Sequence, residues 1–583
     1  MRKTLFRWIA VLLCAALSLP GLAACGGTKD TSAYRAKVDL LKTEVLTETT
    51  AWELGLDPAG DAGYAVFLSV CDVQTRADVF SGTGATLEEA WEAADRAAES
   101  ALAKSGRSPV WMKADLVFQS EKVTYEDLCQ SLSTQRPGSV RFGVSFDDDF
   151  ENALIEAELN AAGAFRCGEE DAGIDKDALN EYLKSADRKK IRKLPDTCIV
   201  FRSFGWLCDE ENNIYMLGSD KTNQGRRRLD IVDAGHAAEV VRSSSDYLKA
   251  QIREDGTFVY GYASGSGTDL EGYNILRHAG AVWSLISSYQ LTRDAALIQP
   301  IDQAVEYMLR QVVSADDQTA YLYEAQTDEI KLGGCGLAVI ALTEYMEAFD
   351  TDKYLDVCRQ LGNGILSLLH AEDGTYYHVL NGDFTEKEAF RTVYYDGEAT
   401  FALCRLYGMT GEAVWLDAAK AAVGHFIAAD YAQYCDPWVA YTMNEITKYV
   451  DDQTYYLFAL ENVQDHYEQL NSETSDPIHL ELLMATFELY DRLVTRGAQI
   501  DGFDKAAFLQ TLYSRADLLL NGYFYPEYAM YMDQPEKILG AFMVREDGFR
   551  TRIDDVQHGI SGFCLYQKNY LKLLAHDLLI YIN

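Results

Sequence analysis

Two polar clusters in the C-terminal half of the chain hold carboxylates that could do chemistry. Asp396 and Glu398 form one cluster, and Asp554 and Asp555 form the other. Two carboxyl groups facing one substrate can divide acid–base work, because one gives a proton while the other activates water. Either pair could instead cap a helix, where negative charge is favoured by about 0.3–1 kcal/mol. All four are catalytic candidates, with acid and base unassigned.

Aromatic, cationic and amide side chains stand near the same segments and could hold a substrate. Aromatic rings offer flat apolar faces, and Arg, His and Gln donate hydrogen bonds. An arginine in an apolar helix is costly to bury without a carboxylate partner, whereas the aromatic residues and a histidine could equally belong to the core. The candidate binding residues are Tyr273, Arg277, His278, Tyr395, Trp438, Tyr441, Gln557 and His558.

The helices that must position these residues form an internal repeat. Turns built on Asp-Gly or Asp-Asp recur at 254–260, 316–322, 372–377 and 546–549, and the first three separate amphipathic stretches. One helical hairpin cannot bury its own apolar face, so several must stack or close into a ring. The pattern predicts inner helices, rich in small and apolar residues, that begin near positions 273, 332, 395, 437, 479 and 557. Outer helices are predicted at 237–251, 298–312, 353–369, 413–428, 454–470 and 505–520.

The N-terminal part of the chain has a different sequence pattern, which predicts strands as well as helices. Apolar segments at 66–72 and 77–82 predict a strand pair. Residues 87–105 predict a helix, with Thr86 as N-cap and Glu89 completing a capping box. Further helices are expected at 125–132, 148–162 and 175–185, and extended segments at 110–118, 197–203 and 214–217. We expect an α+β domain of unknown role at 34–207, a linker at 208–230 and a helical domain at 231–583.

The first 24 residues predict export. Three basic residues precede a short apolar run, and Leu-Ala-Ala-Cys at 22–25 resembles a bacterial lipobox. This resemblance implies a signal peptide at 1–24, lipidation of Cys25 and a tether at 25–33. We therefore expect a lipoprotein of the bacterial cell envelope, held by its acyl anchor on the outer side of the membrane.

Composition excludes some classes of partner. The net charge of −38 argues against nucleic acid, because phosphates would be repelled. It also argues against a broad contact with anionic lipid, so the acyl chain would hold the protein at the membrane. A length of 583 residues exceeds the ~250–300 at which one core stops growing, and two folded parts are expected.

The alternation of Gly- and Ala-rich inner helices with outer helices, as in 397–419, resembles the (α/α)6 toroids of the six-hairpin glycosidase superfamily. The likeness covers residues 231–583 and implies a cleft where the inner helices begin. The expected fold class is therefore mostly α, with a C-terminal (α/α)6 toroid preceded by a smaller α+β domain. This architecture also serves lyases, epimerases and terpenoid cyclases. The Asp-x-Asp-Asp run of a terpenoid cyclase has no counterpart at the corresponding place, which favours carbohydrate chemistry.

The leading hypothesis is a surface-anchored lipoprotein that processes an extracellular polysaccharide by glycoside hydrolysis with a carboxylate pair. A sugar epimerase or polysaccharide lyase on the same toroid is one alternative, in which Tyr273, Arg277 and His558 would matter more than the acids. A non-catalytic polysaccharide-binding or assembly lipoprotein is another. The expected partner is a carbohydrate polymer or oligosaccharide. We expect no cofactor and no metal, since neither a calcium loop nor a Cys/Cys/His zinc set has the required spacing.

Overall fold

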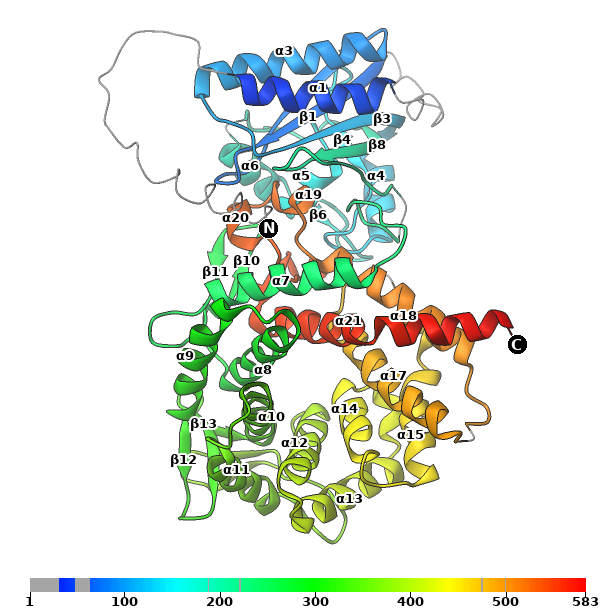
Figure 1. Ribbon diagram of the computed structural model, residues 1–583. Helices are drawn as coiled ribbons and strands as arrows, with labels where there is room; N and C mark the ends of the chain where they lie inside the picture. The colour runs from blue at the N-terminus through cyan, green and yellow to red at the C-terminus, as the bar shows by residue number, and fades with distance from the viewer. Residues whose placement is uncertain are drawn as a thin grey trace, which may run out of the picture.

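The computed structural model describes residues 31–47, 63–186, 188–219, 222–472, 475–498 and 500–582 (Figure 1). The predicted signal peptide, the lipidation site Cys25 and most of the tether lie outside these residues. A sheet-containing domain comes first in the chain, and a ring of helices follows it. The expected fold class, mostly α with a toroid after a smaller α+β domain, is confirmed.

Six inner helices of the described chain form a closed ring, because each packs against the next and the last returns to the first (Figure 1). They are α8 (Ile275–Thr292), α10 (Leu332–Phe349), α12 (Tyr394–Thr410), α14 (Pro437–Ile446), α17 (Ile478–Arg496) and α21 (Ile553–Ile582). Glycine lets neighbouring helices approach closely. A Cβ at Gly336 would lie 2.7 Å from the carbonyl oxygen of Glu398, and one at Gly397 would lie 2.6 Å from Cβ of Trp438.

Six outer helices of the described chain surround this ring and pair with the inner ones. They are α7 (Ala234–Ala250), α9 (Ile298–Leu309), α11 (Leu355–Ser367), α13 (Ala413–Ala428), α15 (Gln453–Gln464) and α18 (Lys505–Leu519). Their buried faces follow helical spacing, as at Ile301, Ala304, Val305 and Met308 of α9. The fifth outer helix is shorter than predicted, because a separate turn of helix, α16 (Tyr467–Leu470), follows it.

Among the described helices, α10 alone is long and apolar enough to cross a membrane. However, 78% of it is buried within the structure. It belongs to the inner ring, where both sides of a helix face other helices, and this accounts for its apolar sequence.

Short strands join the hairpins at one end of the ring. The strands β12 (Val312–Ser314), β13 (Ala320–Glu324), β14 (Glu329–Lys331), β15 (Val379–Asn381) and β16 (Glu386–Glu388) form one sheet. The strands β10 (Gly261–Ala263), β11 (Thr268–Asp269) and β17 (Arg550–Arg552) form another. Gly261 pairs with Arg552, so the chain just before α21 lies beside the chain that leads into α8. The first and last hairpins are therefore neighbours.

The N-terminal domain is built on a seven-stranded antiparallel sheet with the order β2-β1-β3-β8-β4-β5, and β9 pairs with β8. Its strands are β1 (Tyr64–Cys71), β2 (Asp78–Gly84), β3 (Trp111–Thr124), β4 (Gly143–Ser145), β5 (Ala153–Leu154), β8 (Thr197–Cys208) and β9 (Ile214–Met216). Helices α1 (Ser32–Thr47) and α3 (Leu87–Ser105) cover one face (Figure 1). Smaller elements complete the domain: α4 (Tyr125–Ser133), β6 (Phe165–Arg166), β7 (Gly173–Ile174) and α6 (Lys176–Ser185). The predicted capping box of Thr86 and Glu89 is present.

One helix prediction in this domain is wrong. Residues 148–162 hold only the short helix α5 (Glu156–Ala161), preceded by a turn and by β5. The carboxylate of Asp147 accepts hydrogen bonds from the backbone N–H groups of Glu151 and Asn152, at 3.0 and 2.9 Å. Such local bonds give the backbone an alternative to the helix.

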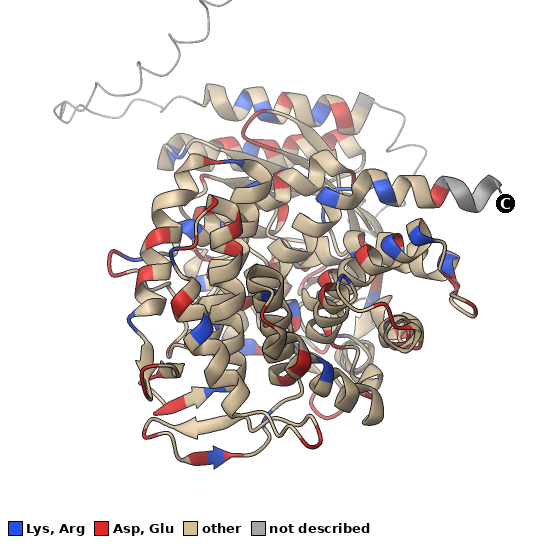
Figure 2. Cartoon of the chain, turned by 60° about the horizontal axis from the view of Figure 1, so that its bottom comes forward, with Lys and Arg blue, Asp and Glu red and all other residues tan. Residues whose placement is uncertain are grey.

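A long excursion between α18 and α21 fastens the ring to the N-terminal domain. It contains α19 (Pro526–Ala529) and α20 (Pro535–Ile538) and reaches the sheet (Figure 1). The hydroxyl of Tyr531 donates to Oγ of Ser69 at 2.8 Å, and Glu527 pairs with Arg227 at 2.9 Å. Figure 2 shows basic and acidic residues interspersed along the helices of the toroid.

Candidate functional site

A cavity of about 680 Å³ lies at the mouth of the ring where the inner helices begin. Residues at the starts of these helices line it, together with the segment that leads into α21. Predicted site residues on this wall are Arg277, Tyr395, Glu398, Trp438, Asp554, Asp555, Gln557 and His558. The pairing of β10 with β17 brings the wall residues at the start of α8 close to those at the start of α21.

Four other predicted site residues do not line this cavity. Asp396 is buried and accepts hydrogen bonds from His378 at 2.9 Å and Tyr431 at 2.8 Å. The hydroxyl of Tyr273 bonds Nδ1 of His278 at 2.7 Å, and burial lowers the pKa of this histidine to about 4. Asp396, Tyr273 and His278 therefore lie behind the residues that line the cavity. Tyr441 lines a different cavity at the opposite end of the ring.

Glu398 is a buried carboxyl group on the wall of the cavity where the inner helices begin. Its side chain is buried, and Oε2 has no hydrogen-bond partner among the described residues. Burial, reinforced by the negative charge of Asp436, raises its pKa well above the usual value, and Arg277 opposes this only in part. A Cβ at Gly333 would lie 1.8 Å from Oε2, so only glycine leaves room for this carboxyl group. This raised pKa favours the protonated form of Glu398, which can give a proton.

Asp554 has the opposite environment. Nε of Arg277 donates to Oδ2 at 2.8 Å, and Nη2 of Arg552 donates to the same oxygen at 2.7 Å. Burial acts to raise the pKa of Asp554, but the hydrogen bond from Arg552 and the charges of the two arginines outweigh it and lower the pKa. The ionised form of Asp554 is therefore favoured, and Asp554 lines the same cavity as Glu398, whose pKa is shifted the other way.

Asp555 binds the strand that precedes its helix. Its carboxylate accepts from Arg550 at 3.1 Å and from the backbone N–H of Arg552 at 3.0 Å. Burial and the charge of Asp554 raise its pKa to about 6. These bonds fix β17 against the start of α21 and so hold the arginines of the cavity wall.

Sequence reasoning missed Glu481, which is fully buried in α17. Its Oε1 lies 2.5 Å from Nδ1 of His558, and the hydroxyl of Tyr441 donates to Oε2 at 3.1 Å. Burial disfavours a charged His558, but the charge and hydrogen bond of Glu481 outweigh it and raise the histidine pKa. The sequence feature that could have identified Glu481 is its place early in an inner helix, because Glu398 is also an acidic residue near the start of such a helix.

Asp476 also lines the cavity and was not predicted, and Tyr394 lines it beside the predicted Tyr395. The carboxylate of Asp476 accepts from the backbone N–H of Ile478 at 3.2 Å and so caps the start of α17. Among the described residues, no group of three or more His, Cys, Asp and Glu side chains is placed to hold a metal ion.

No family model and no curated protein matches this chain in sequence. Solved structures with a similar arrangement include a D-mannose isomerase, with 11% identity over 58% of this chain and 99% of that one and a TM-score of 0.45. An unsaturated glucuronyl hydrolase specific for heparin has 10% identity, covers 58% and 97%, and has a TM-score of 0.42. Cellobiose 2-epimerase from Bacillus thermoamylovorans B4167 has 14% identity, covers 48% and 86%, and has a TM-score of 0.40. At these scores the similarities carry no argument, and the toroid of six hairpins is established by the helices of the chain itself.

Proposed function

We propose that the protein is an enzyme that cleaves a saccharide by acid–base chemistry in the cavity where the inner helices begin. One observation carries this proposal. Glu398 is a buried carboxyl group with a raised pKa, and its Oε2 has no hydrogen-bond partner among the described residues. It lines a cavity whose wall also holds the carboxylate of Asp554. Two carboxyl groups whose environments push their pKa values apart are the arrangement that acid and base roles require.

In this mechanism Glu398 gives its proton to the glycosidic oxygen as the bond to the leaving sugar breaks. A water molecule attacks the anomeric carbon and gives its proton to Asp554, whose negative charge also stabilises the positive charge that develops at that carbon. The charge of Arg277 helps to keep Asp554 ionised, and it opposes the raised pKa of Glu398 only in part.

Other residues of the wall suit recognition of a sugar. The ring of Trp438 lies 6.1 Å from that of His558, and Tyr394 and Tyr395 line the same cavity. Aromatic faces pack on sugar rings, while arginine and glutamine donate to hydroxyl or carboxylate groups. We further propose that the enzyme is anchored at the bacterial surface through lipid on Cys25 and acts on an extracellular polysaccharide, as its N-terminal sequence suggests.

The test is turnover by the full chain, in a detergent without a sugar headgroup, on a panel of bacterial surface polysaccharides and derived oligosaccharides. New reducing ends are expected. Glu398→Gln should retain binding and lose about 10²–10⁴-fold in rate, the usual contribution of a general acid. Asp554→Asn should also lose turnover. A matched control is Glu158→Gln, which alters a buried carboxyl group of the N-terminal domain that also has a raised pKa.

The control should lose stability, because Glu158 pairs with Arg188 at 2.8 Å, yet the folded fraction should keep its activity. Equal losses in both glutamine variants would refute the role of Glu398. Binding without turnover by every form would refute the enzyme and leave a carbohydrate-binding lipoprotein.

The buried pair of Glu481 and His558 favours a second candidate, a sugar epimerase or polysaccharide lyase. A histidine oriented by a buried carboxylate can move a proton at a carbon next to a carbonyl group or a sugar acid. This reaction would give an epimerised product that carries solvent deuterium, or an unsaturated product that absorbs ultraviolet light. His558→Asn would then cost more activity than Glu398→Gln.

A further inference from the structure

A second cavity, of about 600 Å³, lies at the other end of the ring, where the inner helices finish. No residue is shared between its wall and that of the first cavity. The ring of Trp438, on the first wall, lies 5.8 Å from the ring of Trp283, on the second. A layer of aromatic side chains therefore separates two distinct cavities along one axis.

Aromatic residues form the base of this second cavity. The rings of Phe401 and Tyr441 stack with centroids 5.3 Å apart, and Trp283 meets Tyr441 edge to face at 5.3 Å. Each ring contacts the others, so their orientations are fixed before any ligand arrives. Each of these residues is only 5–6% exposed, and the exposed part gives the cavity a small, rigid apolar floor for one face of a sugar ring.

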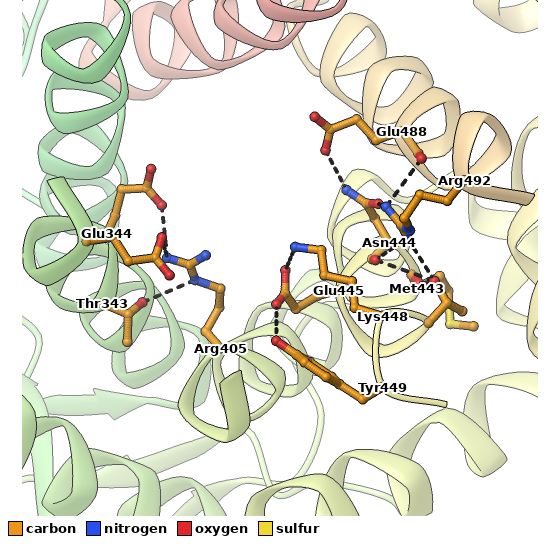
Figure 3. Close-up of polar contacts among 12 residues, drawn as sticks. Thr343, Glu344, Arg405, Met443, Asn444, Glu445, Lys448, Tyr449, Glu488 and Arg492 are labelled. Atoms are coloured by element: carbon orange, nitrogen blue, oxygen red, sulfur yellow. Dashed lines mark hydrogen bonds and ion pairs between the residues drawn. The ribbon is translucent and has the colours of Figure 1, made fainter. Parts of the chain in front are cut away.

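Charged and amide side chains converge above this base from different inner helices (Figure 3). Arg405 pairs with Glu344 at 3.1 Å and with Glu347 at 2.8 Å. Lys448 pairs with Glu445 at 2.5 Å. The hydroxyl of Tyr449 and the amides of Asn444 and Asn569 bond the same wall of carboxylates.

The charges of this wall balance. Its acidic members are Glu344, Glu347, Glu445 and Glu488, and its basic members are Arg293, Arg405, Lys448 and Lys568. An anion would need a surplus of basic groups, and an amine would need a surplus of acidic ones. Alternating donors and acceptors without net charge suit hydroxyl groups, each of which can give one hydrogen bond and accept another.

We infer that this second cavity binds a neutral saccharide. Its aromatic base would contact one face of a sugar ring, and the paired charges would bond the hydroxyl groups at its edge. The inference does not depend on the catalysis proposed for the first cavity, because the two walls are separate. It would give the chain two saccharide sites at opposite ends of one ring.

The experiment is calorimetry of the full chain, in detergent without a sugar headgroup, with maltotetraose, cellotetraose and mannotetraose as neutral probes. A uronate-containing tetrasaccharide and spermidine serve as charged probes. At least one neutral probe should bind, and its affinity should change little with salt concentration, because no net charge is neutralised.

Two variants locate the binding. Ser287→Tyr fills the second cavity without removing an ion pair, and Lys448→Met removes one donor of its wall. Each should weaken binding by about tenfold or more. The matched control is Lys572→Met, which removes a lysine that pairs with Asp491 outside the cavity and should leave affinity unchanged. Thermal unfolding verifies that each variant is folded.

Several results would overturn the inference. The first is that no neutral probe binds. The second is that binding weakens only in the first-cavity variant Arg277→Met. The third is that a charged probe binds most tightly and its affinity depends strongly on salt concentration. Absence of turnover would instead refute only the enzyme proposed for the first cavity.

Discussion

The two mouths of the toroid are made by the same six helices, yet they differ in what they place beside a carboxyl group whose pKa is raised by burial. Burial raises the pKa of Glu398 at one mouth and of Glu344 at the other. Glu344 has Arg405 at 3.1 Å, whereas Oε2 of Glu398 has no partner among the described residues. Burial alone therefore does not mark a proton donor. In the proposed mechanism, Glu398 can exchange a proton with a substrate because its Oε2 has no such partner.

The largest effect is expected where a buried cation is removed. Arg405→Met leaves Glu344 and Glu347 without their shared partner, and the free energy of unfolding should fall by about 3–5 kcal/mol. Arg359→Met removes a half-exposed arginine that pairs with Glu412 and should cost below about 1 kcal/mol. Denaturant unfolding measures both changes. Equal losses would mean that the second mouth is not held by its ion pairs.

The next effect tests the fit around Glu398. Gly333→Ala would place a Cβ 1.8 Å from Oε2 of Glu398, and the carboxyl group must move. Turnover should fall about 100-fold, as expected when a catalytic group is displaced by about 1 Å. Gly334→Ala is the matched control, since its nearest neighbour would be Leu322 at 3.6 Å. It should keep turnover and gain up to about 1 kcal/mol of helix stability. Similar rates in the two variants would contradict the assigned position of the acid.

A smaller effect is expected from the buried partner of His558. Glu481→Gln removes the charge that raises the histidine pKa, so burial should then dominate and the pKa should fall. Titration by NMR measures this shift. Turnover should fall about tenfold if hydrolysis is the reaction, because His558 then only positions the substrate. A loss as large as that of Glu398→Gln would favour the epimerase or lyase instead.

The smallest change is expected in the pH dependence of turnover at the first cavity. Glu398 must keep its proton, so activity should disappear as pH rises through its raised pKa. Asp554 must stay ionised, so activity should disappear as pH falls through its lowered pKa. The profile should therefore be broad, and Glu398→Gln should flatten only its alkaline side. An unchanged alkaline side in this variant would point to another acid.

The same two groups also link pH to stability, and their effects run in opposite directions from each other. The raised pKa of Glu398 means that the folded state holds a proton that the unfolded state releases, and stability falls as pH rises from the usual glutamate pKa to the raised one. The lowered pKa of Asp554 gives stability above the usual aspartate pKa, which is lost as pH falls towards the lowered value.

The sequence by itself determined the repeat of hairpins and the approximate starts of the inner helices. Helical spacing of apolar residues and the small residues at inner positions are local properties, and they predicted all six pairs. The helix expected at 148–162 failed because side-chain bonds of Asp147 compete with the helix, and apolar spacing does not report such bonds. The excursion that fastens the ring to the sheet also escaped prediction, since its contacts join residues as distant as Ser69 and Tyr531.

Only the tertiary structure decided which polar residues share a cavity and in which protonation state. Asp396 and Glu398 are two residues apart. Asp396 is bonded by His378 and Tyr431, whereas Glu398 lines the cavity and its buried Oε2 has no hydrogen-bond partner among the described residues. Asp554 meets Arg277 because the ring closes. The residue types could be read from the sequence, but a pKa depends on burial and on partners from distant helices, and packing alone sets these.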